Sequence, residues 1–134
     1  MSTRQNILLV NPMYEMETLR VVNEEQMDTK ADNMPLGLAT VAALTPDEFH
    51  VDIWDEFVRG PVENSESCYK YDLIGVTSSR VTLLRAMQLV AFFRQQGILT
   101  AVGGPGVSGS PDRCRGYFDI LFIGEAELIW PQFL

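Results

Sequence analysis

Glycine and serine residues that could bind a ligand gather in two short segments, each directly after an apolar run. Gly103, Gly104 and Gly106 follow one run, and Ser78 and Ser79 follow another. A glycine has no side chain, so a flat or bulky ligand can approach its backbone N–H, while a serine hydroxyl both donates and accepts hydrogen bonds. A turn that needs positive φ would also use glycine, and a helix would also use serine as its N-cap. Three glycines within four residues favour a ligand-binding loop.

Residues 104–109 also match the dinucleotide-binding pattern G-x-G-x-x-G. The context does not fit this pattern, because the segment follows the fourth apolar run instead of the first. Pro105 also lacks the N–H group that a pyrophosphate would bind. Pro111 and Gly116 leave little room for a long helix behind the loop. The residues therefore favour another kind of ligand.

The chain lacks the residue combinations that acid–base or nucleophilic catalysis ordinarily needs. His50 is the only histidine of the chain, so a Ser-His-Asp triad, a Cys–His pair at the ligand site and an ordinary zinc site are excluded. Glu125 and Glu127 form a possible carboxylate pair, but acids in a first helical turn ordinarily interact with the helix dipole. A phosphoacceptor site of the receiver type needs acidic residues where Asn11 and Thr77 stand.

The elements that must position these segments follow from the hydrophobic pattern. Short apolar runs alternate with helical or turn-rich segments, which predicts an α/β fold with a parallel sheet. The expected strands are residues 6–10, 49–54, 72–77, 98–102 and 118–123, and the expected helices are residues 35–44, a helix from Leu83 that ends at Gly97, and a helix from about Glu125. Five such strands fit a flavodoxin-like, Rossmann-type sheet of order 2-1-3-4-5 with helices on both faces, in which ligands bind beyond the carboxyl ends of the strands.

Composition limits the partners. The chain has 134 residues, is 46% hydrophobic and carries a formal net charge of −8, which predicts one globular domain and argues against nucleic acid as a partner. Cys68 and Cys114 are too few for a disulfide framework, and no signal peptide or membrane-spanning stretch is present, so we expect a cytoplasmic protein. Residues 13–33 are polar and rich in methionine, which is typical of a lid or binding segment.

Five segments, taken together in their order and spacing, resemble the cobalamin (vitamin B12) binding domain that precedes the radical S-adenosylmethionine (SAM) domain in B12-dependent radical enzymes. The resemblance covers nearly the whole chain. The segments are Ile7-Leu8-Leu9-Val10-Asn11-Pro12, Pro35-Leu36-Gly37-Leu38-Ala39, Asp72-Leu73-Ile74-Gly75-Val76-Thr77-Ser78, Val102-Gly103-Gly104-Pro105 and Gly124-Glu125-Ala126-Glu127.

One departure from the wider cobalamin-binding family has chemical consequences. That family carries D-x-H-x-x-G, then S-x-L, then G-G, and its histidine is the lower ligand of cobalt. In this chain Met34 stands at the histidine position of residues 32–37, and residues 79–81 and 103–104 take the places of the later motifs. The gap between those later motifs is somewhat shorter here. A thioether is a weak donor, so the resemblance implies that cobalamin binds base-off without a histidine ligand, with Met34 as a weak cobalt neighbour.

The resemblance also implies where the cofactor lies. We expect its detached base to enter the sheet between Ser79 and the Gly103-Gly104 pair, with the corrin above the edge of the sheet. No catalytic residue is expected. The expected cofactor-binding residues are Asn11, Pro12, Met34, Leu36, Gly37, Thr77, Ser78, Ser79, Arg80, Val81, Gly103, Gly104, Pro105, Gly106, Gly124, Glu125 and Ala126.

The implied function is that of a cofactor module for methyl transfer or related radical chemistry. Family members cleave SAM with a [4Fe-4S] cluster, but the three-cysteine C-x-x-x-C-x-x-C motif is absent here. We therefore expect residues 1–134 to be a single cobalamin-binding domain of a longer protein, with SAM and the iron-sulfur cluster in a downstream radical SAM domain and no catalysis by this domain alone. The alternative is a flavodoxin-like regulatory or interaction module that binds a flavin, a nucleotide or no cofactor.

Overall fold

The computed structural model describes residues 4–14 and 36–134. Its centre is a parallel sheet of five strands in the order β2-β1-β3-β4-β5, which confirms the predicted flavodoxin-like α/β fold. The predictions for Met34, for Pro35 and for most of the methionine-rich segment fall outside the described residues. The strands are β1 (Gln5–Asn11), β2 (Phe49–Asp55), β3 (Leu73–Thr77), β4 (Leu99–Gly103) and β5 (Ile120–Leu121).

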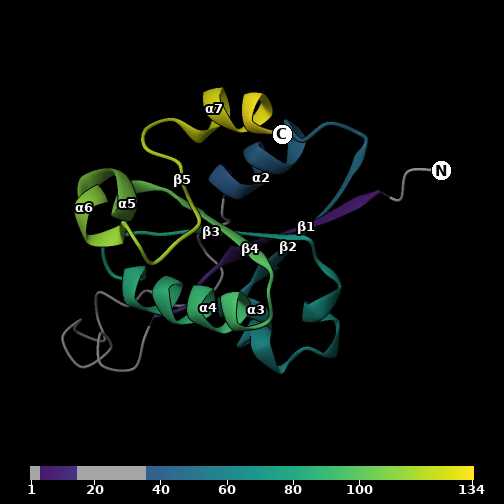
Figure 1. The fold of residues 1–134 in the computed structure, drawn as a ribbon, viewed down its shortest axis with the longest axis horizontal. Helices are drawn as coiled ribbons and strands as arrows, with labels where there is room; N and C mark the ends of the chain where they lie inside the picture. The colour runs from purple at the N-terminus through teal and green to yellow at the C-terminus, as the bar shows by residue number, and fades with distance from the viewer. Residues whose placement is uncertain (1–3, 15–35) are drawn as a thin grey trace.

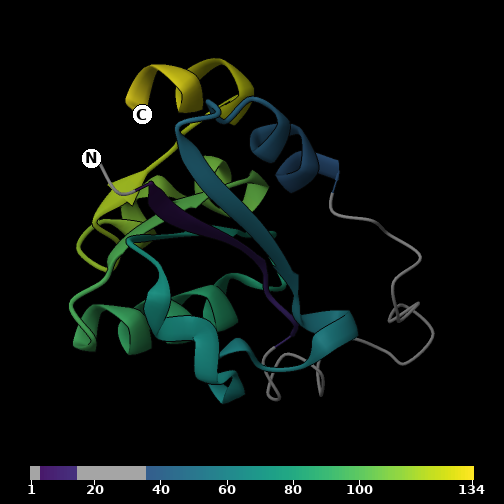
Figure 2. The same cartoon turned by 90° about the vertical axis from the view of Figure 1, so that its right-hand side faces the viewer.

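Helices cover both faces of the sheet, as predicted (Figure 1). The helices α2 and α7 lie side by side on one face, and α4 lies on the other, as the perpendicular view also shows (Figure 2). The short helices α5 and α6 follow the carboxyl end of β4. The bounds are α2 (Leu36–Ala43), α3 (Glu56–Arg59), η1 (Val62–Asn64), η2 (Glu66–Lys70), α4 (Leu83–Gln95), α5 (Pro105–Gly109), α6 (Pro111–Cys114) and α7 (Ala126–Phe133).

The two faces of the sheet carry separate apolar cores. Successive side chains of a strand point to opposite faces, so β1 sends Leu8 and Val10 into the core under α4, and Ile7 and Leu9 into the core under α2 and α7. All four side chains are at most 2% exposed. This burial on both faces explains why β1 is continuously apolar after its start.

The last strand is much shorter than the sequence predicted. We expected residues 118–123, but only Ile120 and Leu121 pair with β4. The Asp119 carboxylate accepts hydrogen bonds from the backbone N–H and the hydroxyl of Thr100, at 2.9 and 3.0 Å. The side chain of Asp119 therefore takes the place that a strand backbone would occupy beside β4.

The structure also excludes one role that the sequence left open for Ser78 and Ser79, that of the N-cap of the following helix α4. Its N-cap residue is Thr82, and neither Ser78 nor Ser79 caps the helix. The hydroxyl of Ser78 donates to the carbonyl of Gly103 at 3.2 Å, and the backbone N–H of Ser79 donates to the Thr82 hydroxyl at 2.9 Å. These serines thus organise the loop after β3. None of the helices in the described part of the chain is long and apolar enough to cross a membrane.

Candidate cofactor-binding site

A cavity of about 450 Å³ opens between the sheet and the helices α2 and α7. It lies over the carboxyl-terminal halves of β1, β3 and β4, which is where a parallel α/β sheet ordinarily binds its ligand. Its volume is within the range of small-molecule sites, roughly 300–1,000 Å³. The lining residues are Leu9, Gly37, Leu38, Val41, Gly75, Val76, Thr77, Ala101, Val102, Gly103, Gly104, Pro105, Ser108, Phe122, Gly124, Glu125, Ala126, Glu127 and Trp130.

Small residues in the middle of the sheet form the floor of this cavity. The strand register puts Leu9, Gly75 and Ala101 in one row across β1, β3 and β4. A Cβ atom on Gly75 would lie only 2.8 Å from Cδ2 of Leu9, so the missing side chain allows Leu9 to lean over the neighbouring strand. With glycine and alanine at the centre of the row, no large side chain rises there to meet the helices.

Aromatic side chains form the wall on the side of α7. Phe122 and Trp130 are 5% and 2% exposed, and their ring centroids lie 5.5 Å apart. The indole N–H of Trp130 donates to the hydroxyl of Thr45 at 2.9 Å, just beyond the end of α2. This bond satisfies the polar atom of the indole and ties α7 to α2, so the wall is held in place while it remains apolar.

The polar side chains that line the cavity lie at the carboxyl edge of the sheet. They are Thr77, Ser108, Glu125 and Glu127. The Ser108 hydroxyl accepts a hydrogen bond from the backbone N–H of Gly124 at 3.0 Å. Glu125 is exposed and Glu127 is half-buried. No lysine, arginine or histidine lines the cavity among the residues that the structure describes.

The structure divides the predicted site residues into two groups, and Met34 lies outside the described residues. The cavity is lined by Gly37, Thr77, Gly103, Gly104, Pro105, Gly124, Glu125 and Ala126. The following predicted residues do not line it: Asn11, Pro12, Leu36, Ser78, Ser79, Arg80, Val81 and Gly106. Asn11, from this second group, donates through its side-chain amide to Asp55 at 3.2 Å, which links the carboxyl ends of β1 and β2.

The slot that we expected between Ser79 and Gly103-Gly104 is closed by the protein itself. The N–H of Ser78 donates to the carbonyl of Gly103, and the N–H of Gly106 donates to the carbonyl of Ser78, both at 2.9 Å. A Cβ atom on Gly104 would lie 2.5 Å from the Ser78 carbonyl oxygen, and one on Gly106 would lie 2.6 Å from that of Ser79. The glycines therefore let two loops of the protein touch, and the open volume lies beside them on the α2 and α7 face.

Sequence reasoning missed the apolar floor and the aromatic wall. Leu9, Gly75, Ala101, Phe122 and Trp130 line the cavity but were not expected to. One signal was available: a glycine inside an apolar strand marks a bend or a close approach of another group, and Gly75 is such a residue. Its significance depends on Ala101 standing beside it, which only the strand register reveals.

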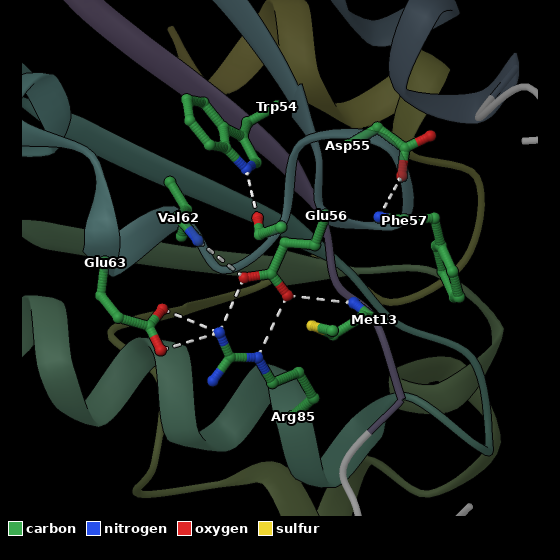
Figure 3. Close-up of polar contacts among 9 residues, drawn as sticks. Met13, Trp54, Asp55, Glu56, Phe57, Val62, Glu63 and Arg85 are labelled. Carbon is green, nitrogen blue, oxygen red and sulfur yellow. Dashed lines mark hydrogen bonds and ion pairs between the residues drawn. The ribbon is translucent and has the colours of Figure 1, made fainter. Parts of the chain in front are cut away.

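A second polar cluster lies on the opposite face, under α4 (Figure 3). The carboxylate of Glu56, which is 1% exposed, accepts two hydrogen bonds from Arg85 at 2.7 and 3.1 Å. It also accepts the backbone N–H groups of Met13 and Val62, both at 3.0 Å. Arg85 donates further to Glu63 at 2.7 Å. Burial alone would lower the pKa of Arg85, but the hydrogen bonds and charges of the two glutamates raise it overall.

Groups that could do other chemistry are isolated. In residues 4–14 and 36–134, no three His, Cys, Asp or Glu side chains are grouped as a metal site would require. Burial raises the pKa of the Cys114 thiol, so this cysteine is a packed core residue with little thiolate character. His50 is exposed at the start of β2, where its ring nitrogen lies 3.2 Å from the carboxylate of Asp52.

The structure is thus that of an α/β domain with a largely apolar cavity at the carboxyl edge of its sheet. No family model and no solved structure matches the chain. Two curated proteins of Chlorobaculum tepidum are similar in sequence. Bacteriochlorophyllide d C-8(2)-methyltransferase is 28% identical over 111 residues, which are 81% of this chain and 24% of that protein. Bacteriochlorophyllide d C-12(1)-methyltransferase is 25% identical over 130 residues, 97% of this chain and 26% of that protein. The chain therefore spans about a quarter of the length of these relatives.

Proposed function

We propose that this domain binds cobalamin base-off, without a histidine ligand to cobalt, as the cofactor module of a radical SAM methyltransferase. The observation that carries the proposal is the apolar cavity beside α2 and α7. The methyltransferase part is supported by the two relatives, which are both methyltransferases. The cofactor is inferred from the resemblance of the segments to cobalamin-binding domains.

The residues of the cavity fit the detached base of cobalamin. A flat dimethylbenzimidazole ring needs an apolar slot with a few hydrogen-bonding groups, and ligand sites of this kind are largely apolar with few polar groups. Gly75 and Ala101 leave room above the sheet, Phe122 and Trp130 offer flat apolar surfaces, and the Thr77 hydroxyl supplies a hydrogen-bonding group. Cobalamin would supply a cobalt centre that carries a methyl group.

The absence of imidazole supports the base-off, histidine-free mode of binding. The only histidine of the chain, His50, is exposed at the amino end of β2, and the cavity opens toward the carboxyl ends of the strands. With the base held in the cavity and His50 at the other edge, the protein has no strong nitrogen donor for the lower face of cobalt. Cobalamin bound in this way would supply a cobalt centre without a histidine ligand from this chain.

The other parts of the reaction are assigned to a larger protein. The chain spans about a quarter of its relatives, which supports a single module, residues 1–134, that acts together with a downstream radical SAM domain. In this proposal SAM and the [4Fe-4S] cluster belong to that domain. The module alone binds cobalamin and catalyses no reaction.

Co-elution with hydroxocobalamin tests the proposal. After removal of free ligand on a desalting column, we expect the red colour to travel with the wild-type domain. Ala101→Leu puts three more carbon atoms into the cavity floor and should abolish co-elution, whereas the control Ala91→Leu adds the same atoms to the exposed surface of α4 and should not. A colourless wild-type domain, or full binding by Ala101→Leu, would contradict the proposal, and circular dichroism verifies that both variants are folded.

Electron paramagnetic resonance tests the coordination. Cob(II)alamin bound to the domain should show no nitrogen superhyperfine splitting, because neither the base nor a histidine binds the metal. A triplet splitting from one nitrogen would refute histidine-free, base-off binding, even if co-elution succeeds.

A further inference from the structure

We propose that Thr45, which does not line the cavity, is a positioning residue of the ligand site. Its hydroxyl accepts the indole N–H of Trp130 at 2.9 Å and so sets how this ring faces the ligand. The inference rests on the proposed function and adds to it a residue that acts on the ligand through another side chain. Thr45 lies just beyond the end of α2, 85 positions before Trp130 in the chain, so no sequence motif connects the two residues.

The hydroxyl of Thr45 is committed to two partners. The last carbonyl groups of a helix have no helical N–H to bind, and the backbone N–H of Thr45 is directed to the carbonyl of Ala42 at 3.1 Å. The Thr45 hydroxyl donates instead to the carbonyl of Val41 at 2.8 Å. Its proton is thereby used, and its oxygen accepts from the indole, which can only donate. One hydroxyl therefore joins Val41 and Trp130, two residues that line the cavity from different helices.

The orientation of Trp130 depends on this acceptor. The residue is 2% exposed, and a buried N–H group without an acceptor is costly, so without the Thr45 hydroxyl the ring would turn until its N–H reached another acceptor or water. The rings of Phe122 and Phe133 lie at centroid distances of 5.5 and 6.2 Å from it, and such a turn would also disturb these contacts. In the native arrangement the N–H points to Thr45, outside the lining of the cavity, and the ligand meets the apolar part of the ring.

Three single variants test this role by calorimetric titration with hydroxocobalamin. Thr45→Val replaces the hydroxyl by a methyl group and should weaken binding on the order of tenfold, because the ligand must bring the indole back from its new partner. Thr45→Ser keeps the hydroxyl and should bind like the wild type. The matched control is Thr40→Val: the exposed Thr40 hydroxyl also donates to a carbonyl of α2, that of Leu36 at 2.9 Å, but Thr40 does not line the cavity, and its loss should leave the affinity unchanged.

A double-mutant cycle shows whether Thr45 acts through Trp130. Trp130→Phe keeps an aromatic ring but removes the N–H, so the addition of Thr45→Val to it should weaken hydroxocobalamin binding no further. A role of Thr45 that is independent of Trp130 would instead weaken binding by the same factor in both backgrounds.

The indole N–H signals in ¹⁵N NMR spectra give a readout that needs no ligand. Trp54 donates its indole N–H to the carbonyl of Gly60 at 2.9 Å and serves as the internal reference. In Thr45→Val the Trp130 signal should shift and its N–H should exchange faster with solvent, whereas the Trp54 signal should not change. In Thr45→Ser both signals should stay.

The outcomes separate this inference from the proposed function. Unchanged affinity of Thr45→Val, an equal loss in Thr45→Ser or Thr40→Val, additive losses in the cycle, or an unshifted Trp130 signal would each overturn the inference alone. If circular dichroism shows that Thr45→Val does not fold, Thr45→Ala takes its place in the same measurements with the same expected results. A wild-type domain that fails to bind hydroxocobalamin overturns the proposed function, and the role of Thr45 with it.

Discussion

The two faces of the sheet use the same strands but differ in how completely they are filled. Under α4, the side chains of Ile74, Val76 and Phe93 are at most 2% exposed, and a buried ion pair has every oxygen engaged. Under α2 and α7, Ala101 and Gly75 leave a cavity of about 450 Å³ in an otherwise apolar core. Protein interiors are ordinarily packed without such volumes.

The difference in packing indicates that the two faces of the sheet have different roles. A volume that no side chain fills lacks packing contacts, so the α2 and α7 face is less completely packed than the α4 face. The α4 face encloses Glu56 and Arg85 so that four segments, the end of β1, α3, η1 and α4, are joined. The α4 face is therefore the more completely packed one, and the other face contains the cavity in which we propose that the ligand binds.

The largest effect is expected from breaking the ion pair on the closed face. Glu56→Gln removes the charge that Arg85, Met13 N–H and Val62 N–H all address, and it leaves the guanidinium without its most buried partner. Removal of one partner of a buried pair costs about 3–5 kcal/mol. The free energy of unfolding, measured by urea denaturation, should fall by that amount.

The matched control for this variant is Glu63→Gln, which changes the second partner of Arg85. The Glu63 side chain is 28% exposed, against 0% for Glu56, so water can replace its interaction and the expected cost is at most about 1 kcal/mol. Equal losses in the two variants would show that Glu56 is not the residue on which this face depends.

The second-largest change in unfolding free energy is expected when alanine is replaced by leucine on each of the two faces. Ala86 of α4 and Ala101 of β4 are both at most 1% exposed, but only Ala101 borders the cavity. Ala86→Leu forces extra carbon atoms into a filled core and should cost about 1–3 kcal/mol. Ala101→Leu has space to enter, so its free energy of unfolding should change by less than about 1 kcal/mol in either direction.

Urea denaturation of the two leucine variants in parallel measures this difference. A loss for Ala101→Leu as large as that for Ala86→Leu would mean that the floor of the cavity is rigidly packed and that the faces are alike. The same variant is the one expected to lose cobalamin, so a stable Ala101→Leu domain separates a binding defect from a folding defect.

The sheet order could be predicted from the sequence because its signals are local. Continuous apolar runs indicate buried parallel strands, and the alternating residues of β2 indicate the edge of the sheet. The positions of Pro111 and Gly116 likewise predicted that no long helix follows the loop after β4, and only the short helices α5 and α6 lie there. These features depend on residues that are close in the chain.

The features that escaped prediction depend on residues that are far apart in the chain. Glu56 has the pattern of an exposed acid after an edge strand, and it is buried only because Arg85, 29 positions later, reaches it. The cavity floor needs Gly75 to stand beside Ala101, and β5 is short because Asp119 binds Thr100. The glycines after β4 were predicted to form a ligand-binding loop, whereas in the structure Gly104 and Gly106 lie against the loop at Ser78, a contact that no local pattern reveals.

The smallest effect concerns a polar cluster at the exposed border of the closed face. Asp52 pairs in register with Leu8, so it lies on the α4 side of the edge strand β2. Burial alone would raise the pKa of Asp52, but the hydrogen bond from the Tyr71 hydroxyl, at 2.8 Å, and the neighbouring His50 and Lys70 lower it overall. Burial and the hydrogen bond to Asp52 both raise the pKa of the Tyr71 hydroxyl.

A lowered carboxyl pKa in the folded state means that the unfolded chain takes up a proton first as the pH falls. The stabilisation by Asp52 is therefore complete above its unfolded pKa, about 3.9, and is lost as the pH falls through that value toward the lower folded one. Tyr71→Phe removes the hydrogen bond, so its deficit in unfolding free energy relative to the wild type should be present near neutral pH and shrink in acid. Because the Asp52 side chain is 38% exposed, solvent screening keeps this deficit below about 1 kcal/mol.

Tyr69→Phe is the control, since the Tyr69 ring packs on Phe92 and is 54% exposed. A deficit that grows in acid would reverse the sign assigned to Asp52, and one as large as that of Glu56→Gln would mean that exposure does not set the strength of polar contacts on this face.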